Sequence, residues 1–336
     1  MILPYRTRCA LRRLLFVLLA LAVLAFVVWG CWMIWLSRYV VYTRDGVKLD
    51  FSLPEKVPTG QTAKPTEPED KIQVNYSDDV AGGSTPLTQL KGYYADINAL
   101  TAGIPAVKAQ IQALPAGTPV MVDVKSISGR FFYSSGVSDV RSETINTQEM
   151  DDLIDYLDQS GMYTIARLPA LRDFYYGLNH VSDGLPIEGG YLWPDEQGCY
   201  WLNPNSGGTL TYLAQIVNEL KALGFDEVVF YDFCFPNTNE IIFKQDKTEA
   251  LSNAAKTLVS SCATDRFAIS FVSSAVFQVP EGRCRLYIQN AEPSNAANLA
   301  QQTGLADPTI RVVFLTELHD TRFDDYSVLR PLSAAH

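Results

Sequence analysis

The stretch GlyPheAspGluValValPheTyrAspPheCysPhePro, residues 224–236, decides the fold prediction. Its centre is a run of apolar and aromatic side chains, which is typical of a strand buried on both faces. Asp232 stands at the end of this run, shortly before Pro236. In a barrel of parallel strands, the carboxyl end of each strand lies at the mouth, where reactive groups gather. The stretch therefore predicts a parallel α/β barrel with Asp232 at its mouth.

Other strand-like runs surround this stretch, and helical patterns separate several of them. The predicted strands cover residues 91–97, 119–125, 162–168, 227–233, 267–272, 285–290 and 311–316. Residues 147–160 and 209–223 have the apolar spacing of amphipathic helices. Strands and helices in alternation predict a parallel sheet. We expect a (β/α)8 TIM-like barrel with irregular or incomplete last elements, because about 20 residues follow the seventh strand.

Side-chain alternation predicts what each strand presents to the barrel axis. On the fourth strand Val228, Phe230 and Asp232 share one face, because successive side chains of a strand point to opposite faces. We expect this face to point toward the axis. Asp226 and Glu227 begin the same strand, so they are expected at the opposite rim, where residues serve stability.

The first 36 residues predict a membrane anchor. Residues 1–13 are basic, and the uncharged run 14–36 is long enough, at about 1.5 Å per residue, to cross a bilayer core of roughly 30 Å. The positive-inside tendency assigns the N-terminus to the cytoplasm and all later residues to the outer side. A cleaved signal peptide is the alternative, but its apolar run would be about 7–15 residues long. The bulky Trp29, Trp32 and Trp35 favour a retained single-pass transmembrane helix.

Composition divides the rest of the chain into three parts. Residues 37–53 predict a short extracytoplasmic hairpin with AspGly as its turn. Residues 54–88 are rich in proline and poor in apolar side chains, which predicts a flexible linker. Residues 89–336 then form the barrel domain, since one such barrel takes about 250 residues.

Charge and cysteine content limit the partners. The formal net charge of −10 argues against nucleic acid, because phosphate binding needs a basic field. The sequence has neither a zinc-type Cys/His cluster nor a phosphate-binding glycine-rich loop, so we expect no metal and no cofactor. Cys199, Cys234, Cys262 and Cys284 are expected outside the membrane, where they permit three full disulfide pairings.

Several segments together resemble the glycoside hydrolase-like TIM-barrel family, a domain of unknown function related to amylase-like hydrolases. They are residues 121–135, 161–173 and 224–236, with 191–204 similar to the family's Trp-rich segment. The similarity covers roughly residues 90–240. The resemblance implies a (β/α)8 barrel, a fourth-strand nucleophile at Asp232, and a polysaccharide or cell-wall glycan as the ligand.

The chain also departs from the family pattern. The family's fourth-strand motif reads AspTyr, an apolar residue, then ArgPhePro, whereas residues 232–236 read AspPheCysPhePro and lack the arginine. The family carries an Asp on the fifth strand, yet residues 267–274 contain no carboxylate. Two functions therefore stay open: a membrane-anchored glycoside hydrolase, and a degenerate barrel that binds glycan or a partner protein at the cell surface. A purely structural envelope protein is a third possibility.

Glycoside hydrolysis ordinarily needs two carboxyl groups, one as acid and one as nucleophile or base. The candidates for a second group beside Asp232 are Asp123, Glu292 and Glu317. Glu317 ranks first, because alternation along the seventh strand places it at the mouth. A solvated acid at a strand end is its plain alternative.

The other candidates also have structural alternatives. Asp232 could form an ion pair with Arg167 across the mouth, and Asp123 could neutralise Lys125. The aromatic residues of the long loop could stack on sugar rings or close a small core beneath that loop. The predicted substrate-binding residues are Arg167, Lys125, Trp193, Tyr200 and Trp201, with Tyr191 as a further aromatic candidate.

Overall fold

The computed structural model describes residues 40–43, 46–49, 86–273 and 277–335. The chain divides into two compact units, residues 1–75 and 76–336. In the first unit, strand β1 (Val40–Thr43) pairs antiparallel with β2 (Gly46–Leu49). The predicted transmembrane helix 14–36 lies outside the described residues, as do residues 1–13 and nearly all of the predicted linker. No helix within the described ranges is long and apolar enough to cross a bilayer.

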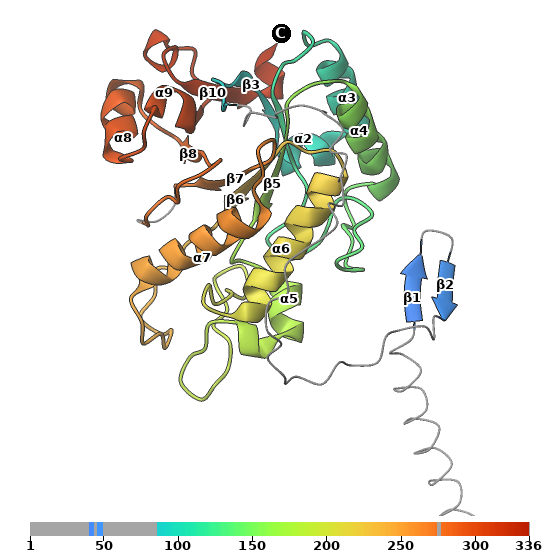
Figure 1. Cartoon of the computed structure of the whole chain (residues 1–336), viewed down its shortest axis with the longest axis vertical. Helices are drawn as coiled ribbons and strands as arrows, with labels where there is room; N and C mark the ends of the chain where they lie inside the picture. The colour runs from blue at the N-terminus through green and yellow to red at the C-terminus, as the bar shows by residue number, and fades with distance from the viewer. Residues whose placement is uncertain (1–39, 44–45, 50–85, 274–276, 336) are drawn as a thin grey trace, which may run out of the picture. The chain divides into compact units, whose positions relative to one another are not determined.

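In the second unit, eight parallel strands close into a barrel (Figure 1). The strands are β3 (Lys91–Ala95), β4 (Val120–Asp123), β5 (Thr164–Pro169), β6 (Glu227–Tyr231), β7 (Ala268–Val272), β8 (Leu286–Gln289), β9 (Val312–Leu315) and β10 (Ser327–Pro331). Strand β10 closes the ring by pairing with both β9 and β3. The predicted (β/α)8 architecture is confirmed.

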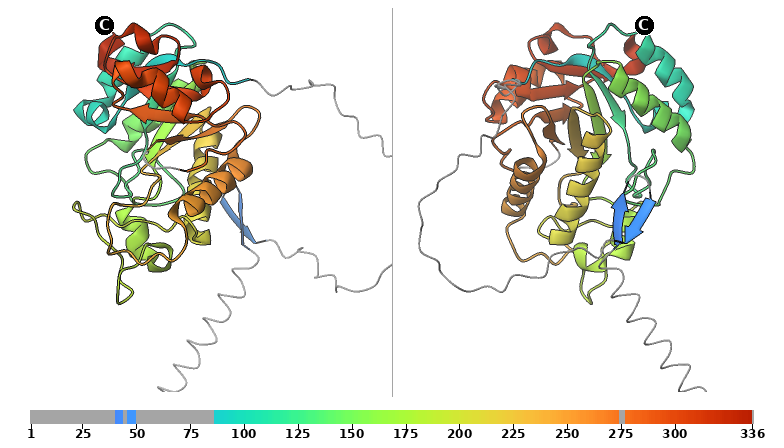
Figure 2. Two further views of the ribbon diagram at one scale, coloured as in Figure 1. Left: turned by 90° about the vertical axis from the view of Figure 1, so that its left-hand side faces the viewer. Right: turned by 45° about the vertical axis from the view of Figure 1, so that its right-hand side comes forward.

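Helices cover the outside of this barrel (Figures 1 and 2). They are α2 (Ile97–Ala102), α3 (Ile104–Gln112), α4 (Thr147–Gln159), α5 (Phe174–Asn179), α6 (Gly207–Ala222), α7 (Lys247–Cys262), α8 (Ala296–Gln302) and α9 (Pro308–Arg311). Short 3-10 turns are η2 (Val181–Asp183), η3 (Pro293–Asn295), η4 (Thr321–Phe323) and η5 (Leu332–Ala335). Side-chain caps begin the long helices: Asn146 caps α4, Ser206 caps α6 and Asp246 caps α7. Helices α6 and α7 lie side by side.

The last quarter of the barrel is irregular but not incomplete. The expectation of a missing element was wrong, because β10 supplies the eighth strand. Its apolar centre is only Val328 and Leu329, which is too short a signal to predict a strand. The described part of the connection between β7 and β8 contains no helix, and α8 and α9 are short.

The barrel interior corrects the predicted face of the fourth strand. Val229 packs inside the barrel, and Tyr231 packs against the same interior cluster. Val228 and Phe230 belong instead to the layer between the strands and the helices. The prediction was wrong because both faces of this strand are apolar, so alternation groups the side chains without telling which group points inward.

A buried polar network lies inside the barrel near the amino ends of the strands. Glu227 has no exposed surface, and its carboxylate accepts hydrogen bonds from four side chains. The Tyr163 hydroxyl donates at 2.9 Å and the Tyr287 hydroxyl at 3.0 Å, and Ser270 and Arg285 also donate. The network joins β6, β7 and β8 with the residue that precedes β5, which fits the stabilising role expected for Glu227.

The cysteines form none of the three full disulfide pairings that the sequence permits. Cys199, Cys262 and Cys284 carry free thiols within the described part of the chain, and all three are buried. Burial raises the pKa of the Cys284 thiol to about 12. The barrel is thus held together by packing and polar contacts among these elements, without bridges between these three residues.

The buried network predicts a large stability loss when its carboxylate is removed. Replacing Glu227 by Ala leaves the Arg285 guanidinium buried without its counter-charge, so the free energy of unfolding should fall by about 3–5 kcal/mol. Denaturant unfolding of the two proteins measures the difference. The control Glu188→Ala removes an exposed carboxylate and should change stability little. Equal stability of Glu227→Ala and wild type would contradict the role of the network.

Candidate functional site

Asp232 lies at the mouth, directly after the last residue of β6. Its backbone has a φ of 50°, in the left-handed region that costs most residues roughly 1–3 kcal/mol. Asp tolerates this region better than other side chains. The Leu171 amide donates to the Asp232 carbonyl at 3.3 Å and helps to hold this turn. The turn ends the regular alternation of β6, so Asp232 does not simply continue either face of the strand.

The Arg172 side chain contacts two carboxylates at once. Its Nη1 lies 3.8 Å from Oδ2 of Asp232, and its Nε donates at 2.5 Å to Oδ2 of Asp195. The Trp201 indole also donates to Asp195, at 3.1 Å, and the backbone amides of Gln197 and Cys199 each donate at 2.9 Å to its other oxygen. Asp195 is therefore hydrogen-bonded on both oxygens, whereas Asp232 has only the long contact with Arg172 among the described residues.

Their surroundings move the pKa values of the two acids in opposite directions. Burial raises the pKa of Asp232, the Arg172 charge lowers it, and the Asp195 charge raises it further, with a net upward shift. Burial would also raise the pKa of Asp195, but the Cys199 amide, the Trp201 indole and other donors outweigh it and hold that pKa below its ordinary value. Asp195 is thus held ionised, while Asp232 takes up a proton more readily than a free carboxyl group.

Asp123 and Arg167 form a second pair at the mouth. Arg167 donates to both oxygens of Asp123, at 2.5 and 2.9 Å, and the Ile97 amide donates to Asp123 at 2.8 Å. The Arg167 guanidinium lies over the rings of Tyr94 and Tyr231, at 5.9 and 5.6 Å. The ion pair between Asp232 and Arg167, which the sequence allowed as an alternative, is therefore not formed. Asp123 is 3% exposed, so it has little surface for a ligand.

Lys125 lies deeper than expected. Its ammonium group is 2.7 Å from Asp173, and neither side chain has any exposed area. The Tyr212 hydroxyl donates to the same Asp173 oxygen at 2.9 Å. Lys125 is therefore neutralised by Asp173 and not by Asp123. In this structure Lys125 has no surface to offer a substrate.

The aromatic candidates of the long loop divide between packing and exposure. Tyr200 stacks on Phe174 with ring centres 5.5 Å apart, and Trp201 is 8% exposed with Arg172 over its ring. Trp193 is partly buried against the core. Tyr191 is 73% exposed. Packing accounts for Tyr200 and Trp201, and Tyr191 is the ring most open to a ligand.

Glu317 follows β9 and is exposed. Burial, and then the charge of Glu317, raises the pKa of Tyr94 on β3, which places Glu317 close to that side of the mouth. Strands β7 and β8 separate β9 from β6, so Glu317 and Asp232 come from different sides of the barrel. Glu292 is also exposed and lies beyond β8. Neither Glu317 nor Glu292 forms a hydrogen bond or ion pair with Asp232 in the described part of the chain.

Sequence reasoning missed Asp195 and Arg172. Both lie in segments that resemble the family, but nothing in their spacing predicts that they meet. Asp195 is held by a local turn, where its Oδ1 accepts from the amides two and four residues later. An AspGluGlnGly sequence is a signal for such a turn, although it does not indicate a contact with Arg172.

The fold is a (β/α)8 barrel with acidic side chains at the carboxyl ends of its strands. A family model described as "Putative glycosyl hydrolase domain" matches residues 106–279, more than half of the chain. The protein belongs to this family. No curated protein matches the chain.

Several solved structures are similar to this chain at low sequence identity. A dextranase from Flavobacterium johnsoniae is 8% identical with a TM-score of 0.51, covering 73% of this chain and 37% of that protein. An exo-β-N-acetylglucosaminidase from Vibrio harveyi is 11% identical with a TM-score of 0.49, covering 73% and 50%. A hypothetical protein from Ruminiclostridium thermocellum is 19% identical with a TM-score of 0.46, covering 54% and 96%. The chain spans half or less of the two named hydrolases.

Tyr231, the residue before Asp232, carries a phenol at the mouth. Tyr231 ends β6 and packs against the barrel interior. Burial, with the Asp123 charge, raises its pKa well above the ordinary value, so the phenol stays protonated. The inward position at the end of the fourth barrel strand therefore carries a neutral phenol.

The raised pKa of Asp232 predicts a pH-dependent effect of its replacement. Its ionisation opposes folding, so this residue's contribution to stability falls as pH rises from its ordinary pKa of 3.8 through the higher folded value. Asp232→Asn should therefore gain stability relative to wild type across this window and keep that gain at neutral pH. Denaturant unfolding from pH 3 to 7 measures it. The control is Asp155→Asn, on the exposed face of α4. If Asp232→Asn instead lost stability relative to wild type as pH rises, the upward shift assigned to the pKa of Asp232 would be wrong.

Proposed function

We propose that the barrel binds polysaccharide at its mouth, with Asp232 accepting hydrogen bonds from sugar hydroxyl groups. We also propose that it is the extracytoplasmic domain of a single-pass membrane protein, anchored by residues 14–36 with residues 1–13 in the cytoplasm. Membership of a glycosyl hydrolase family supports a carbohydrate ligand, and the uncharged run at 14–36 supports the anchor.

The observation that carries the binding function is which carboxylates at the mouth are already occupied by hydrogen bonds. Two-carboxylate hydrolysis needs an acid and a second free carboxylate beside the same bond. Asp123 is bound bidentately by Arg167, and both oxygens of Asp195 accept hydrogen bonds. The Asp232 carboxylate accepts no hydrogen bond within residues 86–273 and 277–335 and has only the 3.8 Å contact with Arg172, so its oxygens are open to a ligand. Glu317 is exposed too, but it follows β9, which β7 and β8 separate from β6. A barrel with one open acid on this side of its mouth can bind sugar hydroxyls without cleaving the glycosidic bond.

Hydrolysis is the second candidate function, and one observation favours it. The pKa of Asp232 is raised and that of Asp195 is lowered, which is how paired carboxyl groups divide into acid and base. Asp232 would then protonate the leaving oxygen, and Asp195 or Glu317 would supply the negative charge. The hydrogen bonds on Asp195 oppose this role, because they occupy its lone pairs.

Glycan binding can be separated from cleavage in one assay series. The full chain is incubated with dextran, with cellulose and with peptidoglycan, and bound protein and new reducing ends are both measured. We expect binding to at least one polymer and no new reducing ends. Asp232→Ala should weaken binding about tenfold, the equivalent of ~1.4 kcal/mol, because it removes charge-assisted hydrogen bonds.

The control for this assay is Asp155→Ala, which removes an exposed carboxylate on α4 and should bind as wild type does. Release of reducing ends by wild type, lost in Asp232→Asn, would replace the binding function by hydrolysis. Absence of binding to all three polymers would argue against a role on these glycans altogether.

The proposed membrane topology has its own test. Protease added to intact cells should digest the barrel domain while a tag placed before residue 1 stays protected, because the anchor would hold the barrel outside. Permeabilised cells, in which the tag should also be digested, serve as the control. A barrel domain that is protected in intact cells, although sensitive once they are permeabilised, would contradict the topology.

A further inference from the structure

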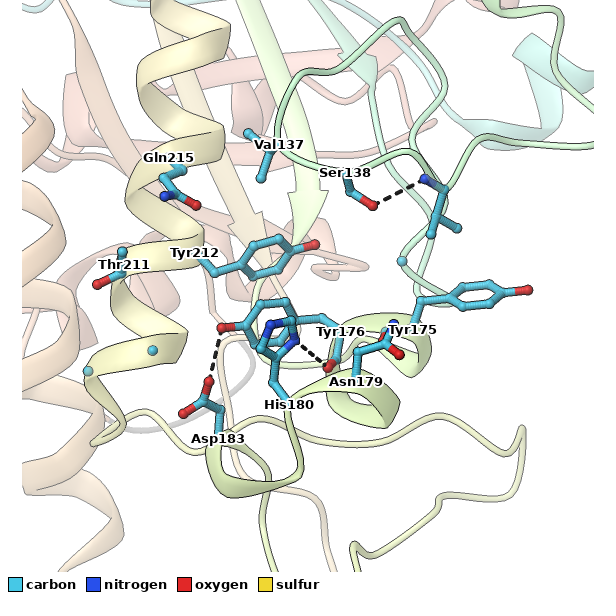
Figure 3. Close-up of a pocket in the computed structure, with 14 residues that line it drawn as sticks. Val137, Ser138, Tyr175, Tyr176, Asn179, His180, Asp183, Thr211, Tyr212 and Gln215 are labelled. Carbon is cyan, nitrogen blue, oxygen red and sulfur yellow. Dashed lines mark hydrogen bonds between the residues drawn. The ribbon is translucent and has the colours of Figure 1, made fainter. Parts of the chain in front are cut away.

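A cavity of about 410 Å3 lies beside the barrel mouth and is separate from the Asp232 site. Loop residues 129–140, which follow β4, form one wall, and α5 and the first half of α6 form the others (Figure 3). We call this cavity the side pocket. Neither Asp232 nor Arg172 nor Asp195 lines it. Its volume is within the usual range of small-molecule sites, about 300–1,000 Å3.

Three stacked rings give the side pocket a rigid aromatic wall. The Tyr212 and Tyr176 rings lie 3.9 Å apart at 15°, and the Tyr176 and His180 rings lie 4.1 Å apart at 14°. Hydrogen bonds fix the stack from both sides: Tyr212 donates to Asp173 at 2.9 Å, and Tyr176 donates to Asp183 at 3.0 Å. Figure 3 shows the rings of Tyr212, Tyr176 and His180 lying one against the next. A ligand would meet this surface already formed, which reduces the entropy cost of binding.

The outermost ring also offers a defined polar atom. His180 is exposed, and its Nδ1 lies 3.1 Å from the carbonyl oxygen of Tyr176. Since a carbonyl only accepts, Nδ1 carries the hydrogen and Nε2 of the neutral ring is left as an acceptor. The end of the stack therefore combines an apolar ring face with an acceptor at its edge.

The opposite sides of the opening carry neutral polar groups. Gln215 extends from α6 and Ser138 from the facing loop, as Figure 3 shows. The Thr211 and Gln215 side chains make no hydrogen bond within the described parts of the chain, so their donors and acceptors are available. Asp183 is the one carboxylate among the described lining residues, and no Lys or Arg lines the side pocket. This charge disfavours phosphate and other anionic ligands.

We propose that the side pocket binds one neutral sugar residue, as a second carbohydrate site beside the barrel mouth. Because Tyr176 lies between the other two rings, its faces are covered and the sugar ring would lie along the edges of the stack. The sugar hydroxyl groups would bond to Gln215, Ser138 and His180. An aromatic surface with neutral amide and hydroxyl groups around it fits such a ring better than it fits a charged ligand. This inference rests on the proposed carbohydrate function and adds a second site to it.

The helix start supplies a variant that fills the side pocket without disturbing its walls. Gly207 is the first residue of α6, is exposed, and has open space where a Cβ would lie. Gly208, by contrast, could not carry a Cβ without striking Asp183. Gly207→Leu should therefore fold normally and occupy the opening. Gln215→Leu removes a polar partner and leaves the wall intact.

Saturation-transfer NMR on the full chain tests the inference with glucose, galactose and N-acetylglucosamine as separate probes. We expect at least one sugar to bind, and Gly207→Leu and Gln215→Leu each to weaken it about tenfold, the equivalent of ~1.4 kcal/mol. Asp232→Asn should leave this sugar bound at the side pocket. The control Asn218→Leu, also exposed on α6 but away from the side pocket, should bind as wild type does.

The outcomes separate this inference from the proposed function. Sugar binding that Asp232→Asn abolishes and the two side-pocket variants leave unchanged would overturn the side pocket and support the mouth. Polysaccharide binding with no response of any free sugar would also overturn the side pocket as a sugar site. Thermal unfolding curves that match wild type show that Gly207→Leu and Gln215→Leu act on binding and not on folding.

Discussion

The Glu227 carboxylate is the constraint on which the closed barrel depends. It lies without exposed surface between strands, and an ionised group in that position is costly unless it is paired and fully hydrogen-bonded. Four donors satisfy it, and Arg285 among them also donates to the Thr88 carbonyl, where the chain enters the barrel domain. The network thus fixes how the strands meet at the amino end and leaves the carboxyl ends to carry the site.

At the mouth, the two arginines decide which acids remain available. Arg167 takes both oxygens of Asp123, and Arg172 lies between Asp195 and Asp232. Of these two acids, Asp232 makes the longer contact with Arg172, at 3.8 Å. On this side of the mouth Asp232 is therefore the acid left open, beside the loop that carries Asp195 and the exposed Tyr191. Binding follows from this arrangement more directly than cleavage does.

Much of the barrel could be predicted from local patterns, because buried parallel strands are continuous apolar runs and their helices are amphipathic. The site could be predicted only in part. The sequence named Asp123 as a candidate acid, but its local pattern could not show that Arg167 is its partner. Sequence reasoning missed Asp195 because a turn places it. The stack around Tyr176 joins α5 to Tyr212 of α6, which the long loop separates in the sequence.

The sequence by itself determined the class of fold, seven of the eight barrel strands, and the position of Asp232 at a strand end. These depend on periodicity and on short-range backbone geometry, which neighbouring residues set. The tertiary structure decided which face of β6 points inward, how β10 closes the barrel, which carboxylates are paired, and where the side pocket opens. Each of these depends on contacts between segments that are distant in the chain. Local sequence patterns do not encode the energies of such contacts, so these features could not be predicted from them.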